Sequence, residues 1–191
     1  MGLGNIHPIK GIARVDSPSA SFGRMREVSK GKDSTTGHWE LSGLILEKDF
    51  PTFPQGFPEH LLKKFLQVTG SKGYLGNKAA SGTAIIQELG DDHVKSGFPI
   101  VYTSADSVFQ IAAHEEVIPL ASLYDICQQT RDIVCIDQYA VGRVIARPFV
   151  GTRGNYTRTT NRRDFSLQPP RKTILDILFD AGIDTAGIGK I

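Results

Sequence analysis

The stretch that organises this sequence is Lys32-Asp33-Ser34-Thr35-Thr36-Gly37-His38-Trp39-Glu40. Its serine follows an acidic residue and precedes two hydroxyl residues and a glycine, which suits the exposed first turn of a helix. Backbone N–H groups in such a turn point at an approaching anion. The same composition is typical of an N-cap, because Asp, Ser and Thr accept hydrogen bonds from those groups. Composition alone therefore favours Ser34 as an N-cap over Ser34 as a nucleophile.

A family resemblance favours the nucleophile. The stretch is similar to the nucleophile segment of the phosphopentomutases, in the alkaline-phosphatase superfamily, where Lys-Asp-Thr, two variable positions and Gly-His-Trp-Glu surround a phosphorylated threonine. Ser34 stands in the place of that threonine and keeps the hydroxyl. The resemblance covers essentially the whole chain. It includes Gly2-Leu3-Gly4-Asn5, the stretches 102–115, 141–151 and 158–164, and the closing Ile188-Gly189-Lys190-Ile191.

The composition is that of an ordinary globular protein. With 191 residues, 40% hydrophobic and 22% charged, the chain can bury one sizeable core or two small ones. No apolar run approaches the roughly 20 residues that span a bilayer, and the N-terminus lacks a signal-peptide layout. We therefore expect a cytoplasmic protein without a membrane partner. Cys127 and Cys135 have no metal or redox spacing and are expected to be buried, reduced thiols.

Hydrophobic spacing and turn residues predict alternating helices and strands, and thus an α/β or α+β unit. Helices are expected at 58–70, 81–90, 119–131 and 174–182. Strands are expected at 99–102, 107–113, 141–149 and 186–191, with a short strand-like run at 11–15. The proline-rich segment 51–58 and Gln168-Pro169-Pro170 interrupt this pattern and mark two domain boundaries.

The phosphopentomutase resemblance implies an α/β fold, with an α+β cap domain inserted into an alkaline-phosphatase-like α/β core that is incomplete here. Residues 1–48 would form a core segment that carries the nucleophile, 49–167 the cap domain, and 168–191 the return segment to the core. Because the chain closes on a run that resembles a buried strand, we expect it to be a piece of a longer protein.

The resemblance also implies a reaction, the interconversion of ribose or deoxyribose 1-phosphate and 5-phosphate in nucleoside and pentose phosphate metabolism. Phosphorylated Ser34 would give its phosphate to the free hydroxyl of the substrate, forming a sugar bisphosphate, and the other phosphate would return to the protein. A sugar bisphosphate would act as primer. Two manganese ions in the complete enzyme would activate the nucleophile, and Ser34 is the one metal contact that the resemblance assigns to this chain.

Two arginines match the phosphate-binding positions of the family. Arg143 and Arg158 would hold the distal phosphate of the substrate, a task that suits the planar, paired donors of guanidinium groups. They belong to a cluster of eight basic residues against one acid between positions 141 and 172. Arg162, Arg163 and Arg171 in that cluster lack such a match and are expected to form a solvated face.

Five other residues match positions that hold the sugar. Ser104 and Asp106 would contact its hydroxyl groups, although the sequence fits Asp106 equally well as the cap of a turn. Val108 and Ile145 would form an apolar wall, and Lys190 would approach from the side of the core.

A two-metal site needs several carboxylate and imidazole ligands. The histidines of the chain are scattered without ligand-like spacing, at His7, His38, His60, His93 and His114. We therefore expect these 191 residues alone neither to bind manganese tightly nor to catalyse the reaction. The oligomeric state is not predicted.

Two alternative functions do not involve catalysis by this chain. One is a sugar-phosphate-binding domain without catalysis of its own. The other is a nucleic-acid-binding module, in which Phe149, Tyr156 and Phe165, interleaved with the arginines, would stack on bases. The second leaves the stretch around Ser34 unexplained, and the resemblance implies pentose phosphates rather than nucleic acid as the partner.

Overall fold

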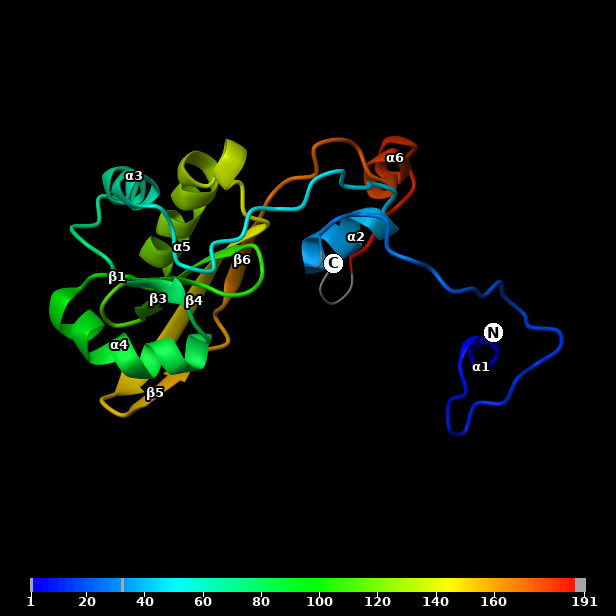
Figure 1. Ribbon diagram of the computed structural model, residues 1–191, viewed down its shortest axis with the longest axis horizontal. Helices are drawn as coiled ribbons and strands as arrows, with labels where there is room; N and C mark the ends of the chain where they lie inside the picture. The colour runs from blue at the N-terminus through cyan, green and yellow to red at the C-terminus, as the bar shows by residue number, and fades with distance from the viewer. Residues whose placement is uncertain (1, 32, 188–191) are drawn as a thin grey trace.

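The computed structural model describes residues 2–31 and 33–187. In this part of the chain a six-stranded mixed sheet lies between helices, so the expected α/β class is confirmed (Figure 1). The strands follow the order β1 (Leu75–Ala79), β2 (Ile100–Thr103), β3 (Val108–His114), β4 (Arg143–Thr152) and β5 (Asn155–Arg158). The last strand, β6 (Arg163–Ser166), pairs with the first half of β4, while β5 pairs with its second half. β1 and β2 are parallel, as are β3 and β4, and the other pairs are antiparallel.

One face of the sheet is covered by α3 (Glu59–Thr69), α5 (Leu120–Gln129), the π-helix η1 (Thr130–Val134) and the 3-10 turn η2 (Asp137–Tyr139). α3 forms because Leu61, Leu62 and Phe65 fall on one side of a helix, and Gly70, at φ 69°, ends it as predicted. The ring of Phe65 packs against Phe109 of β3, with 5.7 Å between the ring centroids.

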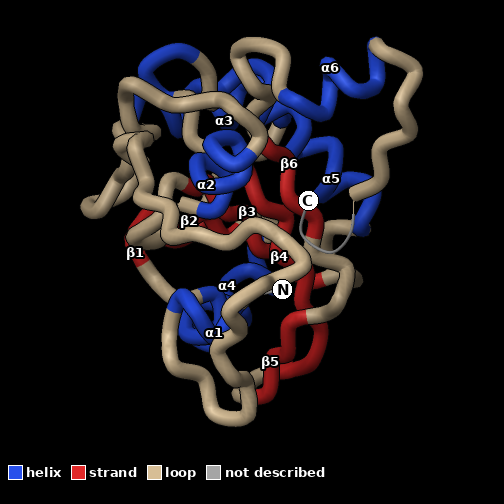
Figure 2. The backbone as a smooth tube through the Cα atoms, turned by 90° about the vertical axis from the view of Figure 1, so that its right-hand side faces the viewer, coloured by secondary structure: helices blue, strands red, loops and turns tan. Residues whose placement is uncertain are grey.

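The opposite face carries α4 (Gly82–Ser96), which lies across the sheet from α3 and α5 (Figure 2). Ser81 caps this helix as predicted, because its hydroxyl accepts a hydrogen bond from the backbone N–H of Ala84. The predicted end at Gly90 is wrong. The helix continues to Ser96 and ends at Gly97, whose φ of 74° closes it. Gly90 instead gives the ring of Tyr156 room to approach the helix.

Three short helices lie outside the sheet: α1 (Leu3–Ile6), α2 (Ser34–Leu41) and α6 (Ile174–Asp180). In Figure 1, α2 and α6 lie to one side of the layered sheet and its helices, and α1 lies at the far end of an irregular lead-in. The N–H of Ile174 donates to the carbonyl of Ser42 and joins the two helices. α6 ends at Asp180, just before the predicted stop at Gly182, whose φ of 72° turns the chain. Most of its apolar residues are exposed, with Phe179 at 73%.

Two expected strands have different outcomes. The run 11–15 is not a strand, because Gly11, at φ 84°, turns the chain and leaves only an isolated bridge between Ile9 and Ile12. The expected strand 186–191 lies mostly outside the described residues, and 183–187 have no regular structure. Cys127 and Cys135 are free and buried as predicted, and burial raises the pKa of Cys135 to about 12. None of the described helices has the length and apolar character that a membrane crossing requires.

Replacing Gly90 with alanine is expected to destabilise the protein by about 1–3 kcal/mol, even though alanine favours a helix by about 1 kcal/mol. A Cβ atom on Gly90 would lie 2.4 Å from Cε2 of Tyr156, a buried ring whose hydroxyl donates to Asp91. Gly37 in α2 is the matched control, because nothing lies within 4 Å of its Cβ position. Urea denaturation of both variants measures the difference. Equal losses of stability in the two would contradict this packing explanation.

Candidate active site

Ser34 is the first residue of α2, and Asp33 is its N-cap. Oδ1 of Asp33 accepts hydrogen bonds from the N–H groups of Thr35 and Thr36, at 2.9 and 3.1 Å, and Oδ2 accepts from the Thr36 hydroxyl. The interpretation of Ser34 as the N-cap is therefore wrong. The first-turn N–H groups of Thr35 and Thr36 were expected to point at an anion, but they donate their hydrogen bonds to Asp33.

The second half of the motif holds α2 in place. Trp39 is buried and packs edge-on against Phe50, with 5.5 Å between the ring centroids. The carboxylate of Glu40 accepts hydrogen bonds from the N–H groups of Val28 and Ser29, at 2.8 and 2.7 Å. Hydrogen bonding from Ser29, and then from Val28, lowers the pKa of Glu40, so the carboxylate is stabilised in its charged form. The residues after Ser34 thus act as a scaffold for the helix that carries it.

A compact joint connects this helix to the sheet. The ring of Phe50 lies against Gly142, where a Cβ atom would be only 3.2 Å from Cδ2. Ser107, just before β3, donates its hydroxyl to the carbonyl of Pro51 at 2.5 Å and accepts from the N–H of Gly142 at 3.2 Å. The N–H of Leu167 donates to the carbonyl of Gly142 as the chain leaves β6. The joint therefore fixes α2 beside the beginning of β4.

A cavity of about 400 Å³ lies between α2 and the sheet. Its walls are Ser34, Thr35 and His38 from α2, Arg143 from β4, and Arg162, Asp164 and Ser166 from β6 and the residue before it. Oδ2 of Asp164 accepts from Nη1 of Arg143 at 3.0 Å and from Nη2 of Arg162 at 2.8 Å. Ser34 therefore shares a cavity with two guanidinium groups, and such groups are well suited to bind phosphate.

Three of the predicted substrate-binding residues share one face of the sheet. Val108 pairs in register with Arg143, and Gln110 with Ile145, so Val108, Arg143 and Ile145 point to the same side. Val108 and Ile145 are each only 2% exposed, while Arg143 lines the cavity with Ser34. Arg147 lies on the same face and donates to the Tyr102 hydroxyl at 3.1 Å.

The other predicted residues are less closely gathered. Ser104 and Asp106 occupy the turn between β2 and β3, where the Ser104 hydroxyl accepts from the N–H of Asp106 at 3.4 Å. Arg158 pairs with Phe149, six residues along β4 from Arg143 and hence about 20 Å away. Arg158 does not line the cavity with Ser34. Lys190 lies outside the described residues.

No family model matches the chain, but curated relatives match all of it. The phosphopentomutase of Carboxydothermus hydrogenoformans is 59% identical over 191 residues, which are 100% of this chain and 49% of the relative. The chain is homologous to phosphopentomutases. Those of Caldanaerobacter subterraneus subsp. tengcongensis and Clostridium acetobutylicum are 59% and 56% identical, again over the whole chain and 48% of each relative. The chain thus spans about half the length of the curated phosphopentomutases it matches, and the resemblance seen in its motifs is confirmed.

Two arginines of the basic cluster of this phosphopentomutase homologue are exposed as expected but also make contacts that the sequence did not indicate. Arg162, with its side chain 41% exposed, lines the cavity and binds Asp164. Arg163 packs its guanidinium over the rings of Tyr124 and Phe165, 5.4 and 5.2 Å from their centroids. Arg171 is exposed as expected. The alternation within β6 was the signal that could have separated Arg163 from Asp164, since neighbouring strand residues point to opposite faces.

The aromatic residues that suggested nucleic-acid binding are core residues. Phe149 is 0% exposed, Tyr156 7% and Phe165 8%, so their rings cannot stack on bases. The alternative of a nucleic-acid-binding module therefore loses the observation on which it rested.

The described residues do not fit the two manganese ions that the phosphopentomutase resemblance implies. Within 2–31 and 33–187, no group of three or more His, Cys, Asp or Glu side chains could hold a metal ion. His38 and Asp164 line the cavity with Ser34, but both oxygens of Asp164 are bound by arginines. These residues alone do not form a two-metal centre.

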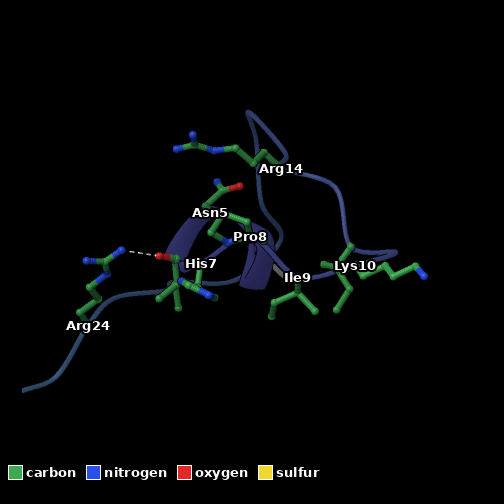
Figure 3. Close-up of a pocket in the computed structure, with 10 residues that line it drawn as sticks. Asn5, His7, Pro8, Ile9, Lys10, Arg14 and Arg24 are labelled. Carbon is green, nitrogen blue, oxygen red and sulfur yellow. Dashed lines mark hydrogen bonds between the residues drawn. The ribbon is translucent and has the colours of Figure 1, made fainter.

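A second cavity, of about 490 Å³, lies in the N-terminal lead-in and is formed by residues 4–24 alone (Figure 3). The guanidinium of Arg24 donates to the carbonyl of Ile6 across it, and Asn5 exchanges hydrogen bonds with the backbone of Val15. Figure 1 shows this segment far from α2. The cavity contains none of the predicted site residues.

Proposed function

We propose that this chain provides the phosphate-carrying serine and much of the substrate-binding face of a phosphopentomutase. This isomerase interconverts ribose or deoxyribose 1-phosphate and 5-phosphate. The observation that carries the proposal is the cavity in which Ser34, in a motif similar to the family's nucleophile segment, meets Arg143. Identity of 59% over the whole chain to curated phosphopentomutases supports it.

The reaction has two phosphoryl transfers. In the first, the free hydroxyl of the bound sugar phosphate attacks phosphorus on Ser34, the bond from phosphorus to Oγ breaks, and a sugar bisphosphate forms. In the second, Oγ of Ser34 attacks the other phosphate of that bisphosphate and becomes phosphorylated again, which releases the isomeric monophosphate. A sugar bisphosphate from solution can load Ser34 in the same way. Positioning and charge stabilisation are the main contributions a protein makes to such transfers.

The proposed roles are assigned from the face of the sheet that carries Val108, Arg143 and Ile145. Arg143 holds the phosphate of the substrate that is not being transferred, and Arg158 reaches it only if its long side chain or the bound ligand spans the distance along β4. Ser104 and Asp106 contact the sugar hydroxyls, and Val108 and Ile145 form its apolar wall. Lys190 completes the site from the core side, and manganese ligands come from outside the described residues.

The same proposal divides the chain into a cap and parts of a core. Residues 49–167 form the α+β cap, and 1–48 and 168–191 belong to an alkaline-phosphatase-like core. In support, all six described strands lie within 49–167, while α2 and α6 lie outside the sheet and are joined by the hydrogen bond from the Ile174 N–H to the Ser42 carbonyl.

Ribose 5-phosphate binding to this chain tests the substrate site, measured by titration calorimetry. Arg143→Ala is expected to weaken the affinity about 10- to 100-fold, because one charged hydrogen bond contributes about 1.5–3 kcal/mol. Arg153→Ala is the control, since the Arg153 side chain is 89% exposed and pairs with Asp91 of α4, beyond the end of β4 opposite to Arg143. An unchanged dissociation constant in Arg143→Ala would overturn the assignment of this site.

A further inference from the structure

We infer that Asp164 is a positioning residue that orients Arg143 toward the substrate phosphate, with Arg162 as the counter-charge that keeps the site cationic. The inference rests on the proposed function, because it assigns the support of the phosphate-binding arginine of that same site. Both residues lie beyond the set that the family motif assigned, and Arg162 was expected to be solvated.

The geometry shows how the carboxylate acts on both arginines. Asp164 sits on β6 opposite Ile145 and next to the Ser166–Arg143 pair, so its side chain lies on the same face as Arg143. Arg162 donates two hydrogen bonds to the Asp164 carboxylate, from Nε to Oδ1 at 2.7 Å and from Nη2 to Oδ2 at 2.8 Å. Arg143 uses one donor, Nη1, at 3.0 Å on the shared Oδ2. A guanidinium has five N–H donors, so Arg143 retains four for a phosphate.

The exposed fractions of the side chains indicate that Arg143 is the arginine fixed by Asp164 and that Arg162 balances the charge of Asp164. The Arg143 side chain is 11% exposed, Asp164 26% and Arg162 41%. A guanidinium that is nearly buried and already fixed loses little conformational freedom when it binds a ligand. The Arg143–Asp164 pair alone would be neutral and would not attract a phosphate dianion. Arg162 restores one net positive charge to the group of three.

The substitution Asp164→Asn is expected to change phosphate affinity in opposite directions, depending on whether Asp164 acts through its charge or by orienting Arg143. If Asp164 affected the phosphate only through its charge, removing that charge would tighten phosphate binding, since like charges repel. If Asp164 acts by orienting Arg143, an uncharged amide in its place holds the guanidinium less firmly and binding weakens. Asp164→Asn therefore separates the two effects by direction.

The test measures ribose 5-phosphate and inorganic phosphate binding to the chain with Asp164→Asn, by titration calorimetry. Affinity for ribose 5-phosphate is expected to fall roughly tenfold, the loss of about one charge-assisted hydrogen bond. Arg162→Gln is expected to weaken binding similarly, and the double variant no more than Asp164→Asn alone, because Arg162 acts by balancing Asp164. Asp125→Asn, an exposed helical position on α5, controls for the loss of one negative charge.

A second readout is independent of ligand. The Nη1–H resonance of Arg143 in a ¹⁵N spectrum, assigned through Arg143→Lys, should be visible in the unsubstituted chain and lost to solvent exchange in Asp164→Asn. An Arg143 resonance unaffected by Asp164→Asn, or equal or tighter phosphate binding, would overturn the inference. Failure of the unsubstituted chain to bind ribose 5-phosphate would count against the proposed function instead, while the Arg143 resonance would still decide the role of Asp164.

Discussion

Replacing Ser34 with alanine is expected to reduce mutase turnover by at least about 10⁴-fold, because the residue that carries the phosphate is lost. The assay uses a chimera in which these 191 residues replace the matching half of the Carboxydothermus hydrogenoformans phosphopentomutase, which is 59% identical to them. Conversion of ribose 1-phosphate to ribose 5-phosphate is followed with manganese and a sugar bisphosphate primer. Ribose 5-phosphate affinity should change little, since Arg143 is untouched.

The neighbouring hydroxyl groups make the expected loss specific. Thr36 is fully buried, donates to Asp33 and packs against Gly31, where a Cβ atom would lie 2.3 Å from its hydroxyl oxygen. Thr35 is 8% exposed, whereas Ser34 is half-buried at the start of the helix. Ser34→Thr, which restores the family residue, should keep most of the activity. Retention of activity in Ser34→Ala, or its loss in Ser34→Thr, would contradict the role of Ser34.

Arg131→Met is expected to destabilise the protein by about 3–5 kcal/mol, the largest loss of stability we predict for a single substitution. Arg131 is 6% exposed and its guanidinium donates to the carbonyls of Val141, at 2.5 Å, and Cys135. These carbonyls belong to the segment that connects η1 to β4. Without Arg131 both would be buried without a hydrogen-bond donor, and the chain leading to Arg143 would loosen.

Guanidinium chloride denaturation followed by circular dichroism measures that loss. Arg153→Met is the control, because its side chain is 89% exposed and a change there should alter stability by less than about 0.5 kcal/mol. A similar midpoint for Arg131→Met and the unsubstituted protein would show that water or a rearranged backbone can satisfy both carbonyls.

The elements with regular apolar spacing were predictable, and the edge elements were not. Three long helices and β2 to β4 carry runs of buried apolar residues, which the sequence displays directly. β1 was missed because its sequence is Leu-Gly-Asn-Lys-Ala, with Gly76 and Asn77 at positive φ. β5 and β6 were missed because each has only four residues with a single buried one.

The site was predictable where a motif carried it and not where pairing of strands created it. The motif around Ser34 and the position of Arg143 could be read from the sequence. Their meeting in one cavity depends on the joint formed by Phe50, Ser107 and Gly142, which are distant in sequence. Asp164 appeared to be one acid among many bases, because its contact with Arg143 exists only once β6 pairs with β4.

The most direct test of the central claim is the identity of the phosphorylated residue. The chimera is incubated with manganese and a sugar bisphosphate, digested, and mapped by tandem mass spectrometry. The expected result is a single phosphate on Ser34, which disappears when excess ribose 5-phosphate is added. Phosphate on Thr35, Thr36 or His38, or no phosphopeptide from a chimera that turns over substrate, would contradict the assignment of Ser34 as the residue that carries the phosphate.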